Sequence, residues 1–168
     1  PSITAYLVSR LIKGQTVGID GLLFSASQVA QLRAALQRHG LKLDTNFAPV
    51  DAIWSDRPSL PACPAFIHED KYAGRSAVEK IARILDEVKL QGAGSLLVSD
   101  LAEVAWTLNI RSRDVNCNPV AYAFLYLAPE GNTLFIKEVK ITPEVADALA
   151  AANVSVAPYD TVIPFLSS

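Results

Sequence analysis

The segment Leu101–Val120, which reads LAEVAWTLNIRSRDVNCNPV, decides the fold of the region around it. Asp100 is suited to cap a helix that begins at residue 101, and Glu103 follows three residues later in a capping-box arrangement. Apolar residues at i, i+3, i+4 and i+7 predict one buried stripe on this helix, formed by Leu101, Val104, Ala105 and Leu108. A polar loop and an Asn-Pro pair come next, and a second apolar run begins after them.

Trp106 does not lie on that buried stripe. At 100° per residue its side chain is roughly 140° round the helix from Leu101. A large aromatic side chain on the outer face needs a cover. The sequence leaves two alternatives open, the loop that follows the helix or a neighbouring domain.

Outward from this segment, helices and strands alternate along the chain. Capping boxes at Ser25 and Ser76 predict the starts of two helices, and Thr142 followed by Pro143 predicts the start of a last one. The helices are expected at 2–13, 25–40, 76–92, 100–108 and 142–152. The strands are expected at 17–20 and 95–99, both buried, and at 41–44, 65–68, 120–127, 133–136 and 154–157. This order predicts an α/β fold with a mixed β-sheet flanked by helices, and a parallel α/β unit in the first 45 or so residues.

A proline-rich segment separates two halves of the chain. The segment Ser55–Pro64 reads SDRPSLPACP and carries three prolines in its last seven residues. Proline removes backbone donors and keeps the chain extended, so this stretch is the best linker candidate.

Composition narrows the functional class. The chain has 168 residues, of which 51% are hydrophobic, and its net charge is −2. This charge shows no basic excess, which argues against a nucleic-acid partner. No apolar run approaches the roughly 18 residues of a membrane helix, so no membrane partner is expected. Cys63 and Cys117 are too few for a disulfide framework and are expected to be reduced thiols in a cytoplasmic protein.

Residues for catalysis are scarce. A metal site needs several convergent His, Asp or Glu side chains, but the chain has only His39 and His68. We therefore predict no metal ligand and no catalytic residue in this chain. The loop 109–114 is the most informative polar segment. Arg111 or Arg113 could bind a carboxylate and Asp114 an amine, or Asp114 could simply neutralise two surface arginines.

At this loop the sequence resembles a known family. LAEVAWTLNIR at 101–111 is similar to the LDEIAWLLNLRG of three-domain Xaa-Pro aminopeptidases (aminopeptidase P). The same family's motifs resemble five further stretches in the same order, namely VGID at 17–20, IWSDRP at 53–58, YAGRS at 72–76 with Lys80, DVNCNPV at 114–120 and TLFI at 133–136. The departures are Ala102 in place of Asp, Ser112 in place of Gly and Arg113 in place of Ser.

The resemblance implies a domain plan. Residues 1–54 would be the carboxy-terminal part of a first creatinase-like domain, 55–71 a proline-rich linker, and 72–168 a second creatinase-like domain that is incomplete at its end. The sequence opens at Pro1, contains no Met and closes just after an apolar run begins, which suggests a piece of a longer polypeptide.

The resemblance also implies a function for the parent protein, which would remove the amino-terminal residue from peptides whose second residue is proline. Its catalytic domain would hold two metal ions, usually manganese, so no cofactor is expected in this fragment. The expected partners are the parent's own catalytic domain and the Xaa-Pro peptide, and a homodimeric parent is left open. We expect the face bearing Trp106, Asn109, Arg111, Asp114 and Asn118 to contact that domain or to wall its substrate cleft.

Two alternatives remain. The chain could be a stand-alone, non-enzymatic α/β binding or scaffold module, or the amino-terminal region of a prolidase or creatinase relative.

Overall fold

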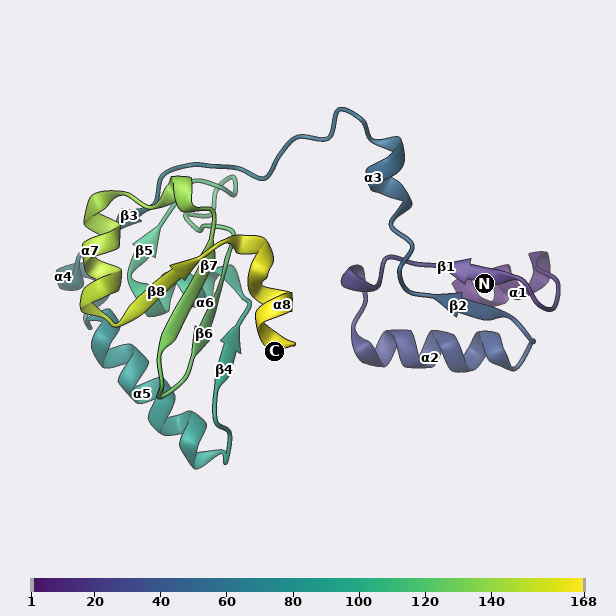
Figure 1. Ribbon diagram of the computed structural model, residues 1–168, viewed down its shortest axis with the longest axis horizontal. Coiled ribbons are helices and arrows are strands. Elements are labelled where there is room, and N and C mark those ends of the chain that lie inside the picture. Colours follow the sequence, from purple (N-terminus) through teal and green to yellow (C-terminus); the bar gives the residue numbers. More distant parts are fainter. Residues whose placement is uncertain (1, 168) are drawn as a thin grey trace. The chain divides into compact units, whose positions relative to one another are not determined.

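The chain folds into two compact units. The computed structural model describes residues 2–167, except for the side chain of residue 51. Unit 1 comprises residues 1–59 and unit 2 residues 60–168 (Figure 1). Each unit is described by itself below.

Unit 1 is a small parallel α/β unit, as predicted. Its strands β1 (Thr16–Gly18) and β2 (Lys42–Asp44) pair in parallel, with Val17 opposite Leu43. Its helices are α1 (Ile3–Arg10), α2 (Ala26–Gln37) and α3 (Pro49–Ile53), with a 3-10 turn at Gly21–Leu23. The predicted capping box at Ser25 is present.

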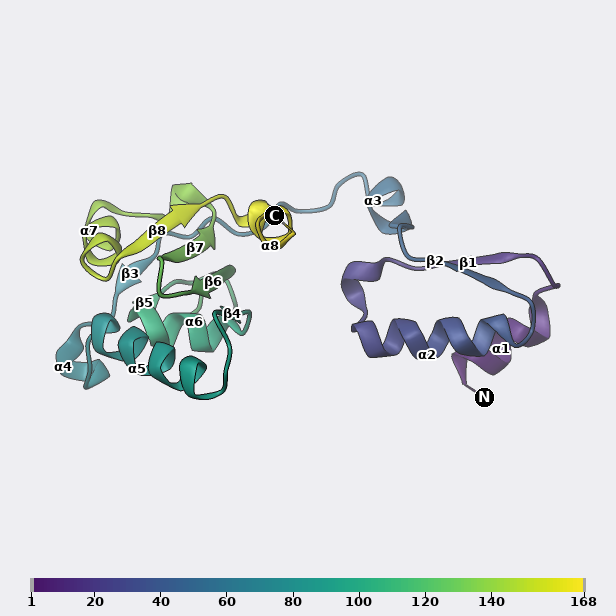
Figure 2. The same ribbon diagram turned by 60° about the horizontal axis from the view of Figure 1, so that its bottom comes forward.

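The expectation of a buried strand at 17–20 is wrong. Both strands of unit 1 show an exposed–intermediate–exposed pattern. Parallel strands become buried when helices cover both faces of the sheet, but α1 and α2 lie on the same side of the pair (Figure 2).

Unit 2 is built on a mixed four-stranded sheet. The strands are β4 (Leu96–Val98), β6 (Ala123–Leu127), β7 (Asn132–Ile136) and β8 (Val154–Ala157), in the order β4-β6-β7-β8. The β4–β6 and β6–β7 pairs are antiparallel, whereas β7 and β8 are parallel. A separate antiparallel pair joins β3 (Phe66–Ile67) to β5 (Ile110–Arg111). The predicted mixed sheet is confirmed. The expectation that β4 is buried is wrong, because it is an edge strand with Leu96 exposed.

Five helices and two 3-10 turns of unit 2 pack around these strands. The helices are α4 (Asp70–Ala73), α5 (Ala77–Leu90), α6 (Leu101–Leu108), α7 (Pro143–Ala151) and α8 (Val162–Leu166), and the turns are Glu138–Lys140 and Tyr159–Thr161. Ser76 and Glu79 form the predicted capping box of α5, and Thr142 caps α7.

The core of unit 2 lies between the inner face of the sheet and helices α5, α6 and α7. Val104 and Leu108 of α6 contribute to it, as predicted, together with Leu125 and Leu127 of β6. The side chains of β6 that alternate with these buried ones face away from the core. Among them, the ring centroid of Phe124 lies 5.3 Å from that of Tyr159.

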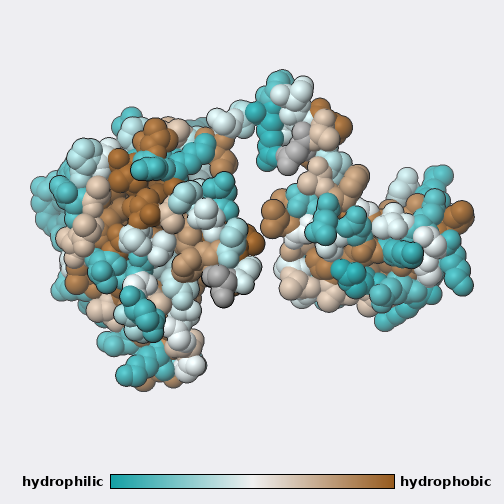
Figure 3. Space-filling view, viewed as in Figure 1, coloured by the Kyte–Doolittle hydropathy of each residue, from teal (hydrophilic) through white to brown (hydrophobic). Residues whose placement is uncertain are grey.

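Helix α7 was expected to be the last helix, but α8 follows it. Phe165 of α8 contacts the rings of Tyr126 and Phe135. Other apolar side chains of α8 remain exposed, among them Ile163. Figure 3 shows apolar and hydrophilic surface side by side on the viewed face of each unit.

The boundary between the units falls inside the segment expected to be a linker. Residues from Leu60 onward are bonded within unit 2. Lys137 Nζ donates to Leu60 O at 2.6 Å, and Ala65 N donates to Lys140 O at 2.8 Å. The strand expected at 65–68 is present as β3. Across the described residues, no helix has both the length and the apolar character needed to cross a membrane.

Candidate binding surface

The two ends of α6 are set by Asp100, which precedes the helix, and Asn109, which follows it. Asp100 accepts hydrogen bonds from Ala102 N and Glu103 N, which caps the first turn. Asn109 ends the helix in the left-handed conformation, with φ at 52°. Asn enters this region more readily than most other non-glycine residues. The chain then turns directly into β5, a strand that the sequence did not reveal.

Asn109 joins three other segments of unit 2. Its side-chain Oδ1 accepts a hydrogen bond from Lys80 Nζ at 2.5 Å. Its Nδ2 donates to Asp70 Oδ1 at 2.9 Å and to Arg75 O at 2.8 Å. The residue is buried. Its side chain therefore holds α4, α5 and α6 together and does not present a polar group to solvent.

Lys80 is buried beneath Trp106. Its Nζ donates to Trp106 O at 2.7 Å and lies 4.6 Å from the centroid of the indole ring. Burial lowers the pKa of the Lys80 ammonium, the charge of Arg111 lowers it further, and Asp70 opposes both effects. Trp106 is still 48% exposed, so the loop that follows α6 does not enclose it.

Arg111 reaches back to the same end of α6. Its Nη1 donates to Ala105 O at 2.7 Å and to Ile110 O at 2.9 Å. Burial lowers the pKa of the guanidinium, but an arginine in a protein keeps its charge. On β5 Arg111 is directly opposite Phe66 of β3, so the two side chains share one face of that pair.

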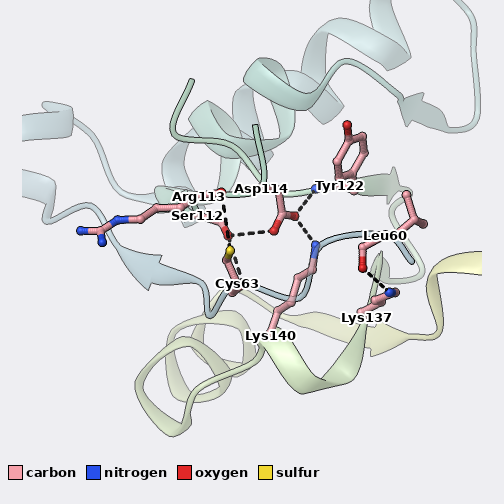
Figure 4. A network of polar contacts seen from close by, with 8 residues as sticks. All are labelled: Leu60, Cys63, Ser112, Arg113, Asp114, Tyr122, Lys137 and Lys140. Carbon is pink, nitrogen blue, oxygen red and sulfur yellow. Dashed lines mark hydrogen bonds and ion pairs between the residues drawn. The ribbon is translucent and has the colours of Figure 1, made fainter. Parts of the chain in front are cut away.

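Asp114 lies in a different cluster, shown in Figure 4. Its Oδ2 accepts from Tyr122 N at 2.8 Å and forms an ion pair with Lys140 Nζ. Both charged side chains have no exposed area. Ser112 Oγ lies 3.5 Å from Asp114 Oδ1 and donates to Cys63 O at 3.1 Å.

The expectation that Asp114 neutralises surface arginines is wrong. Arg113 extends away from it (Figure 4), and Arg111 bonds to the end of α6. Asp114 does bind an amine, but it is the chain's own Lys140, 26 residues further on. Burial explains the difference, because a carboxylate with no exposed area needs a charge partner of its own.

Asn118 lies on the exposed part of the same loop. Its backbone N donates to Val115 O at 3.2 Å, and Cys117 between them has a positive φ of 59°. A shallow depression of about 310 Å³ lies along the loop, where Asn116, Cys117 and Asn118 contribute to its lining.

The predicted site residues thus fall into two groups. Trp106, Asn109 and Arg111 meet around Lys80, whereas Asp114 and Asn118 belong to the loop held by Lys140. The part of the chain that the structure describes contains no group of three or more His, Cys, Asp or Glu residues placed to hold a metal ion. The sequence motif that combines YAGRS at 72–76 with Lys80 already included this lysine, whereas no pattern of neighbouring residues predicted a role for Lys140.

The fold and these motifs define the class of domain. The family of the creatinase/prolidase N-terminal domain matches residues 56–168. This chain belongs to that family, which confirms the resemblance to a creatinase-like amino-terminal region.

Individual relatives narrow the class further. Aminopeptidase P2 of Arabidopsis thaliana is 34% identical over 171 residues, which cover 100% of this chain and 24% of that protein. A probable Xaa-Pro aminopeptidase P of Talaromyces marneffei is 37% identical over 153 residues, which cover 89% of the chain and 23% of that protein.

A solved structure agrees with these sequence matches. X-prolyl aminopeptidase from Caenorhabditis elegans, described as a cytosolic enzyme with a di-nuclear active site, superimposes with a TM-score of 0.89 at 27% identity. The superposition covers 99% of this chain and 27% of that chain. This chain therefore spans about a quarter of the length of these proteins.

Proposed function

We propose that this chain is a non-catalytic, amino-terminal region of an Xaa-Pro aminopeptidase, a hydrolase that removes the residue before a proline. The observation that carries the proposal is the superposition of 99% of the chain on X-prolyl aminopeptidase from C. elegans at a TM-score of 0.89. The names of the sequence relatives support the same activity.

In this proposal the metal ions belong to another part of the complete protein. The nematode enzyme has a di-nuclear active site. The described residues of this chain do not fit such a centre, since no three metal-binding side chains converge. We further propose that these are two manganese ions and that the complete protein is cytoplasmic, as the nematode enzyme is described as cytosolic and di-nuclear.

We also propose the domain plan stated from the sequence, with 1–54 from a first creatinase-like domain, 55–71 as connector and 72–168 as the second. The compact units of the fold support two domains, although their boundary at 59/60 leaves residues 60–71 bonded to unit 2.

Within the second domain, we propose that the Trp106 side of α6 packs toward the catalytic domain and walls its substrate cleft. The half-exposed indole and the charged Arg111 beside it support this role, because Trp and Arg are enriched at protein interfaces.

Two assays test the proposed function. The purified 168-residue chain with added manganese should not hydrolyse Arg-Pro-Pro, whereas the complete protein should. Cleavage by the isolated chain would overturn the non-catalytic role, and an inactive complete protein would overturn the activity.

A prolidase is the second candidate, because the matching family is named for creatinase and prolidase. The two candidates differ in substrate length. A prolidase would cleave the dipeptide Gly-Pro, whereas an Xaa-Pro aminopeptidase would prefer Gly-Pro-Leu.

A further inference from the structure

Two cationic side chains meet at the carboxy-terminal end of α6. Lys80 donates to Trp106 O and Arg111 donates to Ala105 O, so both bind carbonyls of the last helical turn. Burial lowers the pKa of Lys80, and the nearby charge of Arg111 lowers it further. The helix dipole offsets part of this repulsion, because the carboxy-terminal end carries partial negative charge.

In the described part of unit 2, no carboxylate forms an ion pair with either cation. The ion pairs Lys71–Glu69 and Lys140–Asp114 involve other residues. Asp70 is the carboxylate that acts on Lys80, but its Oδ1 accepts from Asn109. The end of α6 therefore keeps an excess of positive charge.

Arg111 has further hydrogen-bond donors with which it can bind a group from outside the chain. Its described hydrogen bonds both start from Nη1, so Nε and Nη2 remain for another acceptor. The side chain is only partly buried. A planar guanidinium with adjacent donors matches the geometry of a carboxylate.

An exposed aromatic side chain lies beside each cation, Trp106 at Lys80 and Phe66 opposite Arg111, and a groove without Arg111 in its lining lies beside Trp106. Trp106 is 48% and Phe66 44% exposed. A groove of about 370 Å³ runs beside Trp106 and Ile84 and is lined also by Lys80, Arg83 and Glu87. This volume is at the small end of ligand pockets, so it fits one or two peptide residues better than a helix.

We propose that Arg111, Lys80 and Trp106 form a binding site for the carboxyl terminus of a short peptide, with an apolar residue of that peptide packed on the indole. The inference deepens the proposed function, on which it rests for the peptide as natural ligand. The carboxylate would bind the free donors of Arg111 in the field of Lys80.

The test is a fluorescence titration of the 168-residue chain in a Trp54→Phe background. This substitution leaves Trp106 as the sole tryptophan. The probes are acetyl-Gly-Pro-Leu as the free acid and as the carboxamide. The amide should bind about five- to tenfold more weakly, because it loses a charge-assisted hydrogen bond. Equal affinities, or no binding of either peptide, would overturn the proposal.

A third probe, acetyl-Gly-Glu-Leu-amide, distinguishes a chain end from an acidic side chain. It should bind as weakly as the simple amide. If it binds as tightly as the free acid, our proposal that the bound carboxylate is a peptide's carboxyl terminus is wrong.

Variants locate the site. Arg111→Met should reduce the preference for the free acid to less than about twofold, whereas Arg113→Met, also in the loop after α6, should leave it unchanged.

Because Arg111 also caps α6, backbone amide shifts of the unsubstituted chain provide a second measurement. The free acid should shift residues 105–111 and not 114–119, and the reverse would place the site elsewhere. These measurements need no catalytic domain, so their failure is distinct from failure of the aminopeptidase assays.

Discussion

Lys140 and Asp114 form an ion pair in which neither side chain has any exposed area. The pair connects the 3-10 turn after β7 to the loop after β5, and Tyr122 N completes the bonding of the carboxylate. Removing two charges from water is costly, so such a pair stabilises a fold only when both partners are present. Ser112 Oγ, which contacts Asp114 and donates to Cys63 O, also binds the loop after β5 to the segment before β3.

Lys140→Met should therefore destabilise the chain by about 3–5 kcal/mol, because it leaves Asp114 buried without a counter-charge. Urea denaturation followed by circular dichroism measures this change. Lys71→Met removes an exposed ion pair instead and should cost less than about 1 kcal/mol. Equal effects of the two substitutions would contradict the prediction.

Asn109 should be sensitive to substitution for two separable reasons. Asn109→Gly keeps the left-handed backbone but loses the bonds to Lys80, Asp70 and Arg75, and should cost about 2–3 kcal/mol. Asn109→Ala should cost about 1 kcal/mol more, because alanine resists a positive φ. Thermal and urea denaturation of both variants give the comparison.

Asn153 is the matched control, since it has a φ of 53° and an exposed side chain. Asn153→Ala should cost only the backbone part, about 1 kcal/mol. If Asn153→Ala and Asn109→Ala are equally destabilising, the side-chain bonds of Asn109 contribute little.

Lys80 should make stability depend on alkaline pH. Its pKa is lower in the folded than in the unfolded chain, so the unfolded chain binds the proton more tightly. Stability must then rise with pH from the lowered pKa up to the ordinary value of 10.5. The free energy of unfolding of the unsubstituted chain relative to Lys80→Met should increase over this interval. A flat or falling difference would show that burial does not penalise the ammonium.

Substitution of Trp106 should affect the kinetics of the complete protein more than the stability of this chain. Its half-exposed ring and its contact with Lys80 predict that Trp106→Ala costs the isolated chain about 1 kcal/mol. In the complete enzyme the same substitution should lower kcat/KM for Xaa-Pro peptides several-fold, if this face meets the catalytic domain. Leu90→Ala, at the exposed end of α5, should change neither quantity. Unchanged kinetics for Trp106→Ala would argue against the proposed contact.

Local signals in the sequence predicted most elements of the fold. The caps at Ser25, Ser76 and Thr142 and the hairpin of β6 and β7 could be read directly, because each depends on residues close together in the chain. Strand β5 was missed because two residues give no periodicity. Helix α8 was missed because it is one turn with Pro164 in its middle, and its packing depends on aromatic rings of the sheet.

The candidate site was predicted only in part. The angle of Trp106 on the helix predicted that it lies off the buried stripe and needs a cover, and Arg111 was predicted as a carboxylate-binding group. The partner of Asp114 could not be predicted, because Lys140 reaches it only after the chain has passed through two strands. Likewise, the burial of Asn109 depends on α4 and α5, which precede it by about 20 residues or more.

The proline-rich segment before β3 is not a spacer that can be trimmed freely, because its main chain is hydrogen-bonded to unit 2. Leu60 O accepts from Lys137, Cys63 O accepts from Ser112, and Ala65 N donates to Lys140 O. A shortened protein that starts at residue 60 keeps all three attachments. One that starts at residue 66 would lose them all, and with them the bonds to Ser112 and Lys140, the two residues whose side chains contact the Asp114 carboxylate.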